Sequence, residues 1–302
     1  MKKSEIKNIL VPVDFSETSE IALTEAVKLA SLLKANIFLI HVIEYLNEFN
    51  GYFYSVVPEM QTSLPHLLEF EKTVDKKMEE KKTEINKKYG ITPDVFIASG
   101  QVHSEIIRFS EKKKIDLIVM GTHGVSGYKE LFIGSNAQRV VTLSDIPVLT
   151  IQKEISKTGF KNILIPIDNA LHSREKVNMA LLIAEVFGST IHIIGLPDSE
   201  EELDVNKIKI KLESVEKIIS NDKLLYKTTI VHGKNLAMDA LSYADENNCD
   251  LIVINTGHES KLTGIFLGAF AQQLVNHSKI PVLSIKHKEG YFIIETPGFG
   301  IS

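Results

Sequence analysis

A glycine-containing segment followed by a Gly-Ser step is the part of this sequence best suited to chemistry. Residues 120–124 read Met-Gly-Thr-His-Gly, and residues 134–136 read Gly-Ser-Asn after nine intervening residues. Glycine tolerates positive φ and lets the backbone approach a ligand closely. A helix that begins at the Gly-Ser step presents unpaired N–H groups and the positive end of its dipole, which suits a phosphate. The spacing therefore indicates an anion-binding cradle.

The flanking residues place this cradle at the end of a strand. Residues 115–120 (IDLIVM) form a short apolar run typical of a buried parallel strand, and apolar residues recur at helical spacing after Gly134. Open α/β sheets bind ligands outside the carboxyl ends of their strands. The motif is neither a P-loop nor G-x-G-x-x-G. Taken alone it is a weak sign of a nucleotide site, and its position after a strand strengthens that interpretation.

The first half of the chain alternates strands with helices. We expect strands at residues 8–14, 36–43, 94–98, 115–120 and 147–151, and helices at 19–34, 67–89, 103–113 and after Gly134. Residues 44–66 are irregular and predict a long loop. His41 lies within an apolar strand, where a satisfied core histidine is the expected role. Such alternation predicts a doubly wound parallel sheet.

The pattern occurs a second time. The heptapeptide NILVPVD at 8–14 returns as NILIPID at 162–168, and the strand that leads to Gly121 returns as CDLIVIN at 249–255. The fold class expected is therefore α/β, with two tandem doubly wound domains. The expected division is a first domain at 1–152, a second at 159–288 and a C-terminal tail at 289–302.

Composition and charge exclude several classes of protein. The chain has 302 residues and a formal net charge of −5, so it carries no basic stripe for nucleic acid. No segment has the pattern of a signal peptide or a membrane span, and we expect no membrane partner. The single cysteine, Cys249, excludes an internal disulfide framework and fits a reducing cytoplasm. We expect that thiol to be buried and inert.

Together these motifs resemble the universal stress protein family in its tandem two-domain form. The residues that carry the resemblance are ILVPVD, LIHVI, GQVHSEI, DLIVMGTHG, GSNAQRV and IPVLTI, spread over residues 5–152. Residues 159–287 match the scaffold of the family but lack its binding motif. The resemblance implies five-stranded parallel sheets of order 3-2-1-4-5, the adenine-nucleotide alpha-hydrolase-like fold. It also implies ATP as a ligand, accompanied by Mg²⁺.

The resemblance assigns roles to eleven residues around an adenine nucleotide. Asp14 would lie at the ribose or at a metal near the phosphates, and Val42 would offer backbone groups to the adenine. The first glycine segment would wrap the ribose and phosphates, and the Gly-Ser-Asn step would bind phosphate oxygens. The cofactor-binding set is Pro12, Val13, Asp14, Val42, Met120, Gly121, His123, Gly124, Gly134, Ser135 and Asn136. No catalytic residue and no set of metal ligands is assigned.

The second half departs from this pattern. The aligned changes are Gly121 to Asn255, Gly124 to His258 and Ser135 to Ala269. Asp168 and Gly268 are retained, but bulky side chains stand where backbone should approach the ligand. The sequence therefore predicts one nucleotide site per chain, in the first half.

Three functions remain open. The first is an ATP-binding regulatory protein of the stress response. The second is a scaffold without nucleotide, whose glycine segment only makes a tight turn and whose role is dimerisation and partner binding. The third is a slow ATP hydrolase, for which the sequence offers no Walker lysine and no paired carboxylates. Strands at 147–151 and 281–285 are edges that we expect to join the two halves, and we also expect a homodimer.

Overall fold

The computed structural model describes residues 6–44, 64–122, 133–153, 159–169, 176–221, 224–256 and 267–286. Expectations for the loop at 45–63, for His123, Gly124 and His258, and for the tail at 289–302 lie outside the described residues. Within these ranges, strands and helices alternate along the whole chain, as the sequence predicts.

The first half contains five strands and four helices in the described residues. They are β1 (Asn8–Pro12), α1 (Glu17–Leu33), β2 (Asn36–Ile43), α3 (Leu64–Tyr89), β3 (Asp94–Ser99), α4 (Val102–Lys112), β4 (Leu117–Gly121), α5 (Ser135–Leu143) and β5 (Val148–Ile151). Helix α1 begins two residues earlier than expected because Ser16 is its N-cap, with its hydroxyl accepting from the Ser19 N–H at 3.2 Å.

The second half repeats this order. Its elements are β6 (Asn162–Asp168), α6 (Val177–Phe187), β7 (Thr190–Leu196), α7 (Glu202–Asn221), β8 (Leu225–Ile230), α8 (Leu236–Glu246), β9 (Leu251–Thr256), α9 (Ala269–His277) and β10 (Val282–Lys286). Helix α6 begins at Val177, nine residues after β6 ends, whereas α1 begins five residues after β1 ends.

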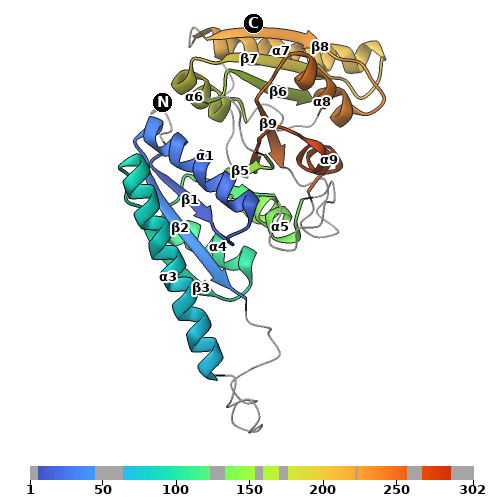
Figure 1. Ribbon diagram of the computed structural model, residues 1–302. Coiled ribbons are helices and arrows are strands. Elements are labelled where there is room, and N and C mark those ends of the chain that lie inside the picture. Colours follow the sequence, from blue (N-terminus) through green and yellow to red (C-terminus); the bar gives the residue numbers. More distant parts are fainter. Residues whose placement is uncertain are drawn as a thin grey trace, which may run out of the picture.

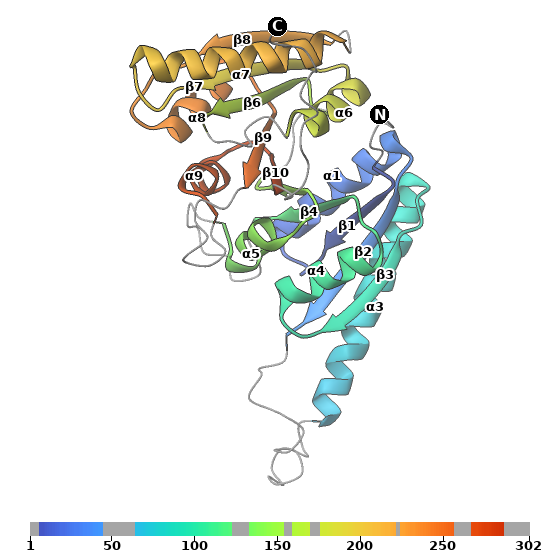
Figure 2. The ribbon, with the colours of Figure 1, turned by 180° about the vertical axis from the view of Figure 1, so that it is seen from behind.

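All ten strands form one sheet, in the order β3-β2-β1-β4-β5-β10-β9-β6-β7-β8. Each half has the predicted order 3-2-1-4-5, and every pair within a half is parallel. At the junction, β5 and β10 lie antiparallel, with Leu149 opposite Leu283. Figures 1 and 2 show the two halves from opposite sides, adjoining along this pair of strands.

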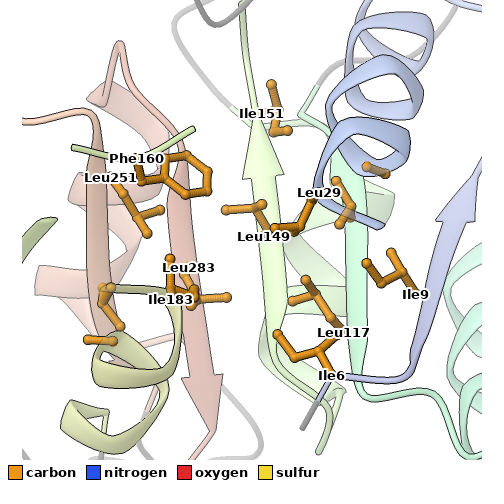
Figure 3. Packing of buried hydrophobic residues seen from close by; sticks show 14 of the residues in the cluster. Ile6, Ile9, Leu29, Leu117, Leu149, Ile151, Phe160, Ile183, Leu251 and Leu283 are labelled. Carbon is orange, nitrogen blue, oxygen red and sulfur yellow. The ribbon is translucent and has the colours of Figure 1, made fainter. Parts of the chain in front are cut away.

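Helices cover both faces of the sheet, and apolar side chains fill the space between. The helices α1, α3, α6 and α7 pack on one face, and α4, α5, α8 and α9 pack on the other. On the first face the apolar cluster is continuous across the junction: Leu149 of β5 and Leu283 of β10 lie between Leu29 of α1 and Ile183 of α6 (Figure 3). Burial of this core stabilises the two halves as one body.

Candidate functional site

A cleft of about 200 Å³ opens at the carboxyl ends of β1, β2 and β4, where the sheet order predicts a ligand site. Nine of the eleven residues singled out in the sequence line it: Pro12, Val13, Asp14, Val42, Met120, Gly121, Gly134, Ser135 and Asn136. The other two, His123 and Gly124, lie outside the described residues. The remaining lining comes from Ser19, Ile40, Val102, Ile106, Thr122 and Ala137.

Sequence reasoning missed the α4 side of this cleft. Val102 and Ile106 lie on the first two turns of α4 and supply apolar wall, and Ile106 is fully buried. The signal for them was available, because Val102 belongs to the GQVHSEI motif and Ile106 stands one helical turn after it. An apolar wall beside polar strand ends suits a ligand with one apolar and one charged part.

The segment after β1 presents a carboxylate to the cleft. Asp14 Oδ1 accepts hydrogen bonds from the Ser16 backbone N–H at 2.9 Å and from the Ser16 hydroxyl at 2.5 Å. The same hydroxyl caps α1 through Ser19. Carboxylate, cap and helix start are therefore one hydrogen-bonded unit, and the position of Asp14 is fixed by the start of α1.

A histidine of β2 and a lysine of α3 support this segment. His41 Nδ1 lies 2.7 Å from the Val13 carbonyl oxygen, so His41 is a satisfied histidine of the sheet rather than part of the cleft lining. Phe15 has a φ of 64°, and its ring centroid lies 5.0 Å from that of His41. Lys77 Nζ of α3 lies 5.1 Å from the centre of the Phe15 ring, a cation–π distance. These contacts tie the segment around Asp14 to the α3 face of the sheet.

The glycine at the end of β4 is required by helix packing. A Cβ added at Gly121 would lie 2.8 Å from the backbone carbon and oxygen of Thr18 and 3.0 Å from the Ser19 nitrogen. Real Cβ atoms do not approach backbone this closely, so α1 could not begin where it does with any larger residue at this position. The sequence suggested that this glycine lets a ligand approach, and the structure adds a second role, because the glycine also admits the first turn of α1.

Helix α5 begins at the cleft with no side chain capping it. Gly134 is the N-cap, its backbone N–H donates to the Thr122 carbonyl at 2.6 Å, and no acidic residue occupies the first turn. Ser135 is exposed and Asn136 is half-buried, and both line the cleft. The first-turn N–H groups and the helix dipole therefore give this edge of the cleft a positive potential.

The donor set fits a hard divalent cation that arrives with a phosphate. Asp14 is the one acidic residue in the described lining of the cleft. In the described parts of the chain, no group of three or more His, Cys, Asp or Glu side chains could hold a metal ion by itself. Mg²⁺ in nucleotide sites takes one or two carboxylates and completes its shell with phosphate and water oxygens. The cleft thus suits a metal–nucleotide complex rather than a resident metal.

The equivalent region of the second half contains lysines. Lys211 Nζ of α7 donates to the backbone carbonyl of Asp168, at the end of β6, at 2.9 Å. Lys176, at the start of α6, is only 2% exposed, and burial lowers its pKa to about 8, with nearby Asp168 opposing the shift and Lys211 adding to it. Where the first half has a cleft around Asp14, the second half places two lysines of its own near Asp168.

The close approach of α7 accounts for this arrangement. Gly195 of β7 occupies the position of His41 in the repeat, and a Cβ there would lie 2.4 Å from Ile208 and 2.9 Å from Leu212, both on α7. The missing side chain lets these apolar residues pack directly on the strand, and it brings Lys211 within reach of Asp168. Phe270 stands at the position of Asn136, so apolar surface also replaces a polar residue at the start of α9.

The structure also bears on the cysteine and on the expectation of no membrane span. Cys249 is buried beside β9, and burial raises the pKa of its thiol to about 12, which bears out the expectation of an inert cysteine. None of the helices in the described ranges combines the length and the apolar character that crossing a membrane requires.

Comparison with known proteins identifies the family. The profile of the Universal stress protein family matches residues 5–152 and again residues 159–286. A universal stress protein of Methanocaldococcus jannaschii is 32% identical over 157 residues, covering 50% of this chain and 97% of that protein. The Bacillus subtilis universal stress protein YxiE is 32% identical over 153 residues, covering 48% of this chain and 97% of that protein.

A solved structure extends the likeness to nearly the whole chain. The crystal structure of a universal stress protein from Archaeoglobus fulgidus DSM 4304 superposes with a TM-score of 0.69 at 20% identity, covering 94% of this chain and 98% of that one. Its likeness concerns the fold, whereas the two profile matches establish the family. The chain therefore belongs to the universal stress protein family and carries two of its domains in tandem.

Proposed function

We propose that this chain is a regulatory protein that binds ATP with Mg²⁺ at one site, in its first half. The observation that carries the proposal is the cleft itself: nine residues from four separate segments, chosen from the sequence for this ligand, line one cavity. The family resemblance contributes the identity of the ligand, because many members of the family bind ATP.

Each part of the cleft has a place in this proposal. The N-terminus of α5, with Ser135 and Asn136, holds phosphate oxygens through backbone N–H groups and the helix dipole. Asp14 binds either the ribose or the Mg²⁺ that accompanies the phosphates. The backbone at Val42 contacts the adenine, and the wall of α4 packs on its face. The family resemblance assigns further ribose and phosphate contacts to His123 and Gly124, which lie outside the described residues.

The second half serves as a partner domain without nucleotide. Lys176 and Lys211 surround Asp168, and Asn255 and Ala269 replace the glycine and the serine of the first-half site. A cation supplied by the protein leaves no need for the metal that Asp14 is proposed to bind.

The assembly proposed for solution follows from the sheet. We assign domains to residues 1–152 and 159–288, with a tail at 289–302, and expect the pairing of β5 with β10 to hold the halves together. Two chains then associate as a homodimer. The lone buried Cys249 fits a reducing compartment, and we place the protein in the cytoplasm.

One observation favours the alternative, a scaffold that binds no nucleotide. Packing of α1 alone requires a glycine at position 121, so this residue is explained without any ligand. Calorimetry with Mg²⁺ and ATP separates the two functions, since the scaffold would show no heat of binding at millimolar ATP. The proposed function requires one ATP per chain.

A matched pair of variants locates the site. Ser135→Asp places a carboxylate at the start of α5, where it repels phosphate, and should abolish binding. Ala269→Asp makes the same change at the start of α9, in the second half, and should leave both affinity and stoichiometry unchanged. Binding of two ATP per chain, or loss of binding in Ala269→Asp alone, would contradict a first-half site.

A further inference from the structure

The two halves share a buried hydrogen bond at the edge of the cleft. Asn276 lies near the end of α9, and its Oδ1 accepts from the backbone N–H of Ile133 at 3.2 Å. The two residues are 143 positions apart, and they are only 8% and 7% exposed. Ile133 immediately precedes Gly134, the N-cap of α5, so the contact falls next to the proposed phosphate-binding turn.

In the described residues, the second half contributes this side chain to the first half, and the first half contributes no equivalent bond to the second. The residue of the first half that corresponds to Asn276 is Thr142, and its hydroxyl donates to the Gln138 carbonyl of its own helix at 2.7 Å. The first half therefore holds its own helix with Thr142, whereas the second half extends an amide across the junction. An approximate twofold relation between the halves does not require this bond, so it is specific to this site.

Two consecutive backbone donors fix the start of α5. The Gly134 N–H donates to Thr122 at the end of β4, within the first half, and the Ile133 N–H donates to Asn276 of the second half. A buried backbone N–H is costly to leave without an acceptor. Removing the Asn276 amide would therefore favour a different position of the segment that enters α5.

We propose that Asn276 is a positioning residue for the phosphate-binding turn, so that the second half sets the affinity of the first-half site. The affinity part rests on the proposed function, whereas the positioning part concerns the protein without ligand. Because coupling of two equilibria is reciprocal, a ligand that orders the turn also strengthens its contact with α9. The degenerate half then acts as a regulator of the site.

The test compares two variants at the same junction. Asn276→Leu keeps the size of the side chain and removes the acceptor. Gln152→Leu is the matched control, because Gln152 Nε2 donates across the junction to the carbonyl of Val275, the neighbour of Asn276, at 2.9 Å without contacting the turn. Hydrogen exchange of the Ile133 and Gly134 amides is measured without ligand, and ATP affinity is measured by calorimetry with Mg²⁺.

The expected result is selective. In Asn276→Leu, hydrogen exchange of the Ile133 amide should be about tenfold faster and ATP affinity about tenfold weaker. In Gln152→Leu, the exchange rate and the affinity should each change by less than about twofold. Equal effects in the two variants would mean that the Asn276 contact only stabilises the junction, and this result would overturn the proposal. Unchanged exchange and affinity in Asn276→Leu would also overturn it.

Failure of the proposed function gives a different result. If the wild-type protein binds no ATP, that function fails, and the exchange comparison still decides whether Asn276 positions the turn. Should the leucine variant not fold, Asn276→Ala removes the same acceptor without adding apolar atoms, and its exchange at Ile133 decides the question.

Discussion

The two halves of this chain share their interior and differ at their strand ends. The central strands β1 and β6 have the same fully buried core, with Ile9 to Val11 in one and Ile163 to Ile165 in the other. At the carboxyl ends of the strands, the first half has a cleft around Asp14, whereas the second half has lysines and packed apolar side chains. Buried apolar residues thus preserve the fold through duplication, and a few positions at the strand ends decide whether a cleft remains.

The sharpest difference between the halves is one side chain at the end of the fourth strand. Gly121 lets α1 begin against β4, and Asn255 stands at that position in β9, where α6 begins later relative to its strand. The residue at the end of the strand and the starting point of the neighbouring helix therefore both differ between the two halves. Since Asp14 is hydrogen-bonded to the capped start of α1, a change at Gly121 reaches the cleft through the helix.

Transplanting that side chain should have the largest effect. Gly121→Asn puts a Cβ 2.8 Å from the backbone of Thr18, so we expect loss of ATP binding and about 3 kcal/mol of the free energy of unfolding. Calorimetry and urea unfolding measure the two effects. The reverse change, Asn255→Gly, should cost about 1 kcal/mol through backbone entropy and create no second site. An intact ATP site in Gly121→Asn would show that α1 and the cleft are not coupled.

The buried lysine of the second half gives a prediction on pH. Lys176 has a pKa of about 8 in the folded protein against 10.5 ordinarily, so between these values only the unfolded chain holds the proton. The free energy of unfolding then rises with pH in this window, and the contribution is absent below pH 8. The wild-type stability relative to Lys176→Met should increase by about 2 to 3 kcal/mol from pH 7 to pH 10.

Urea unfolding of both proteins at the two pH values measures this difference. Lys209→Met, a change of an exposed lysine on α7, is the matched control and should follow the wild type. A constant difference between wild type and Lys176→Met would mean that the ammonium is not desolvated in the folded state.

Lys77 and Lys211 stand at equivalent positions of the repeat, and replacing each should have a small effect on a different property of the protein. Lys77 lies over Phe15, and Lys211 donates to the carbonyl of Asp168. Lys77→Met should weaken ATP binding by about twofold without changing the second half, because a cation–π contact at an exposed site contributes about 0.5 kcal/mol. Lys211→Met should destabilise the second half by about 1 kcal/mol and leave ATP affinity alone. Calorimetry measures the ATP affinity of both variants, and urea unfolding measures their stability. The roles would be refuted if Lys77→Met lowered only the stability and Lys211→Met lowered only the ATP affinity.

The fold could be predicted from the sequence because its signals are local. Apolar runs mark the strands, the repeat of NILVPVD marks the second domain, and strand order follows from the family. The nine lining residues could be predicted from the sequence for the same reason, since each stands directly at the end of a strand or at the start of a helix. The start of α1 was misplaced because two hydroxyl residues offered caps and Ser16 rather than Thr18 forms the bond.

Features that depend on contacts between segments far apart in the sequence could not be predicted. Asn276 and Ile133 are far apart in the sequence, and neither belongs to a motif. The burial of Lys176 could not be predicted, because no local pattern reports that Asp168 of β6 and Lys211 of α7 lie near it. The packing role of Gly121 could not be predicted for a similar reason, since its neighbour in space is helix α1, far earlier in the sequence.

The antiparallel pairing of β5 with β10 has a consequence for concentration. Two separate domains joined along one edge come apart on dilution, whereas two domains on one chain meet at an effective concentration set by the linker. We therefore expect the pairing of the two halves to be independent of protein concentration. It also pairs the inner edge strands, so that β3 and β8 are the outer edges of the described sheet, and a further strand added to this sheet would join at one of them.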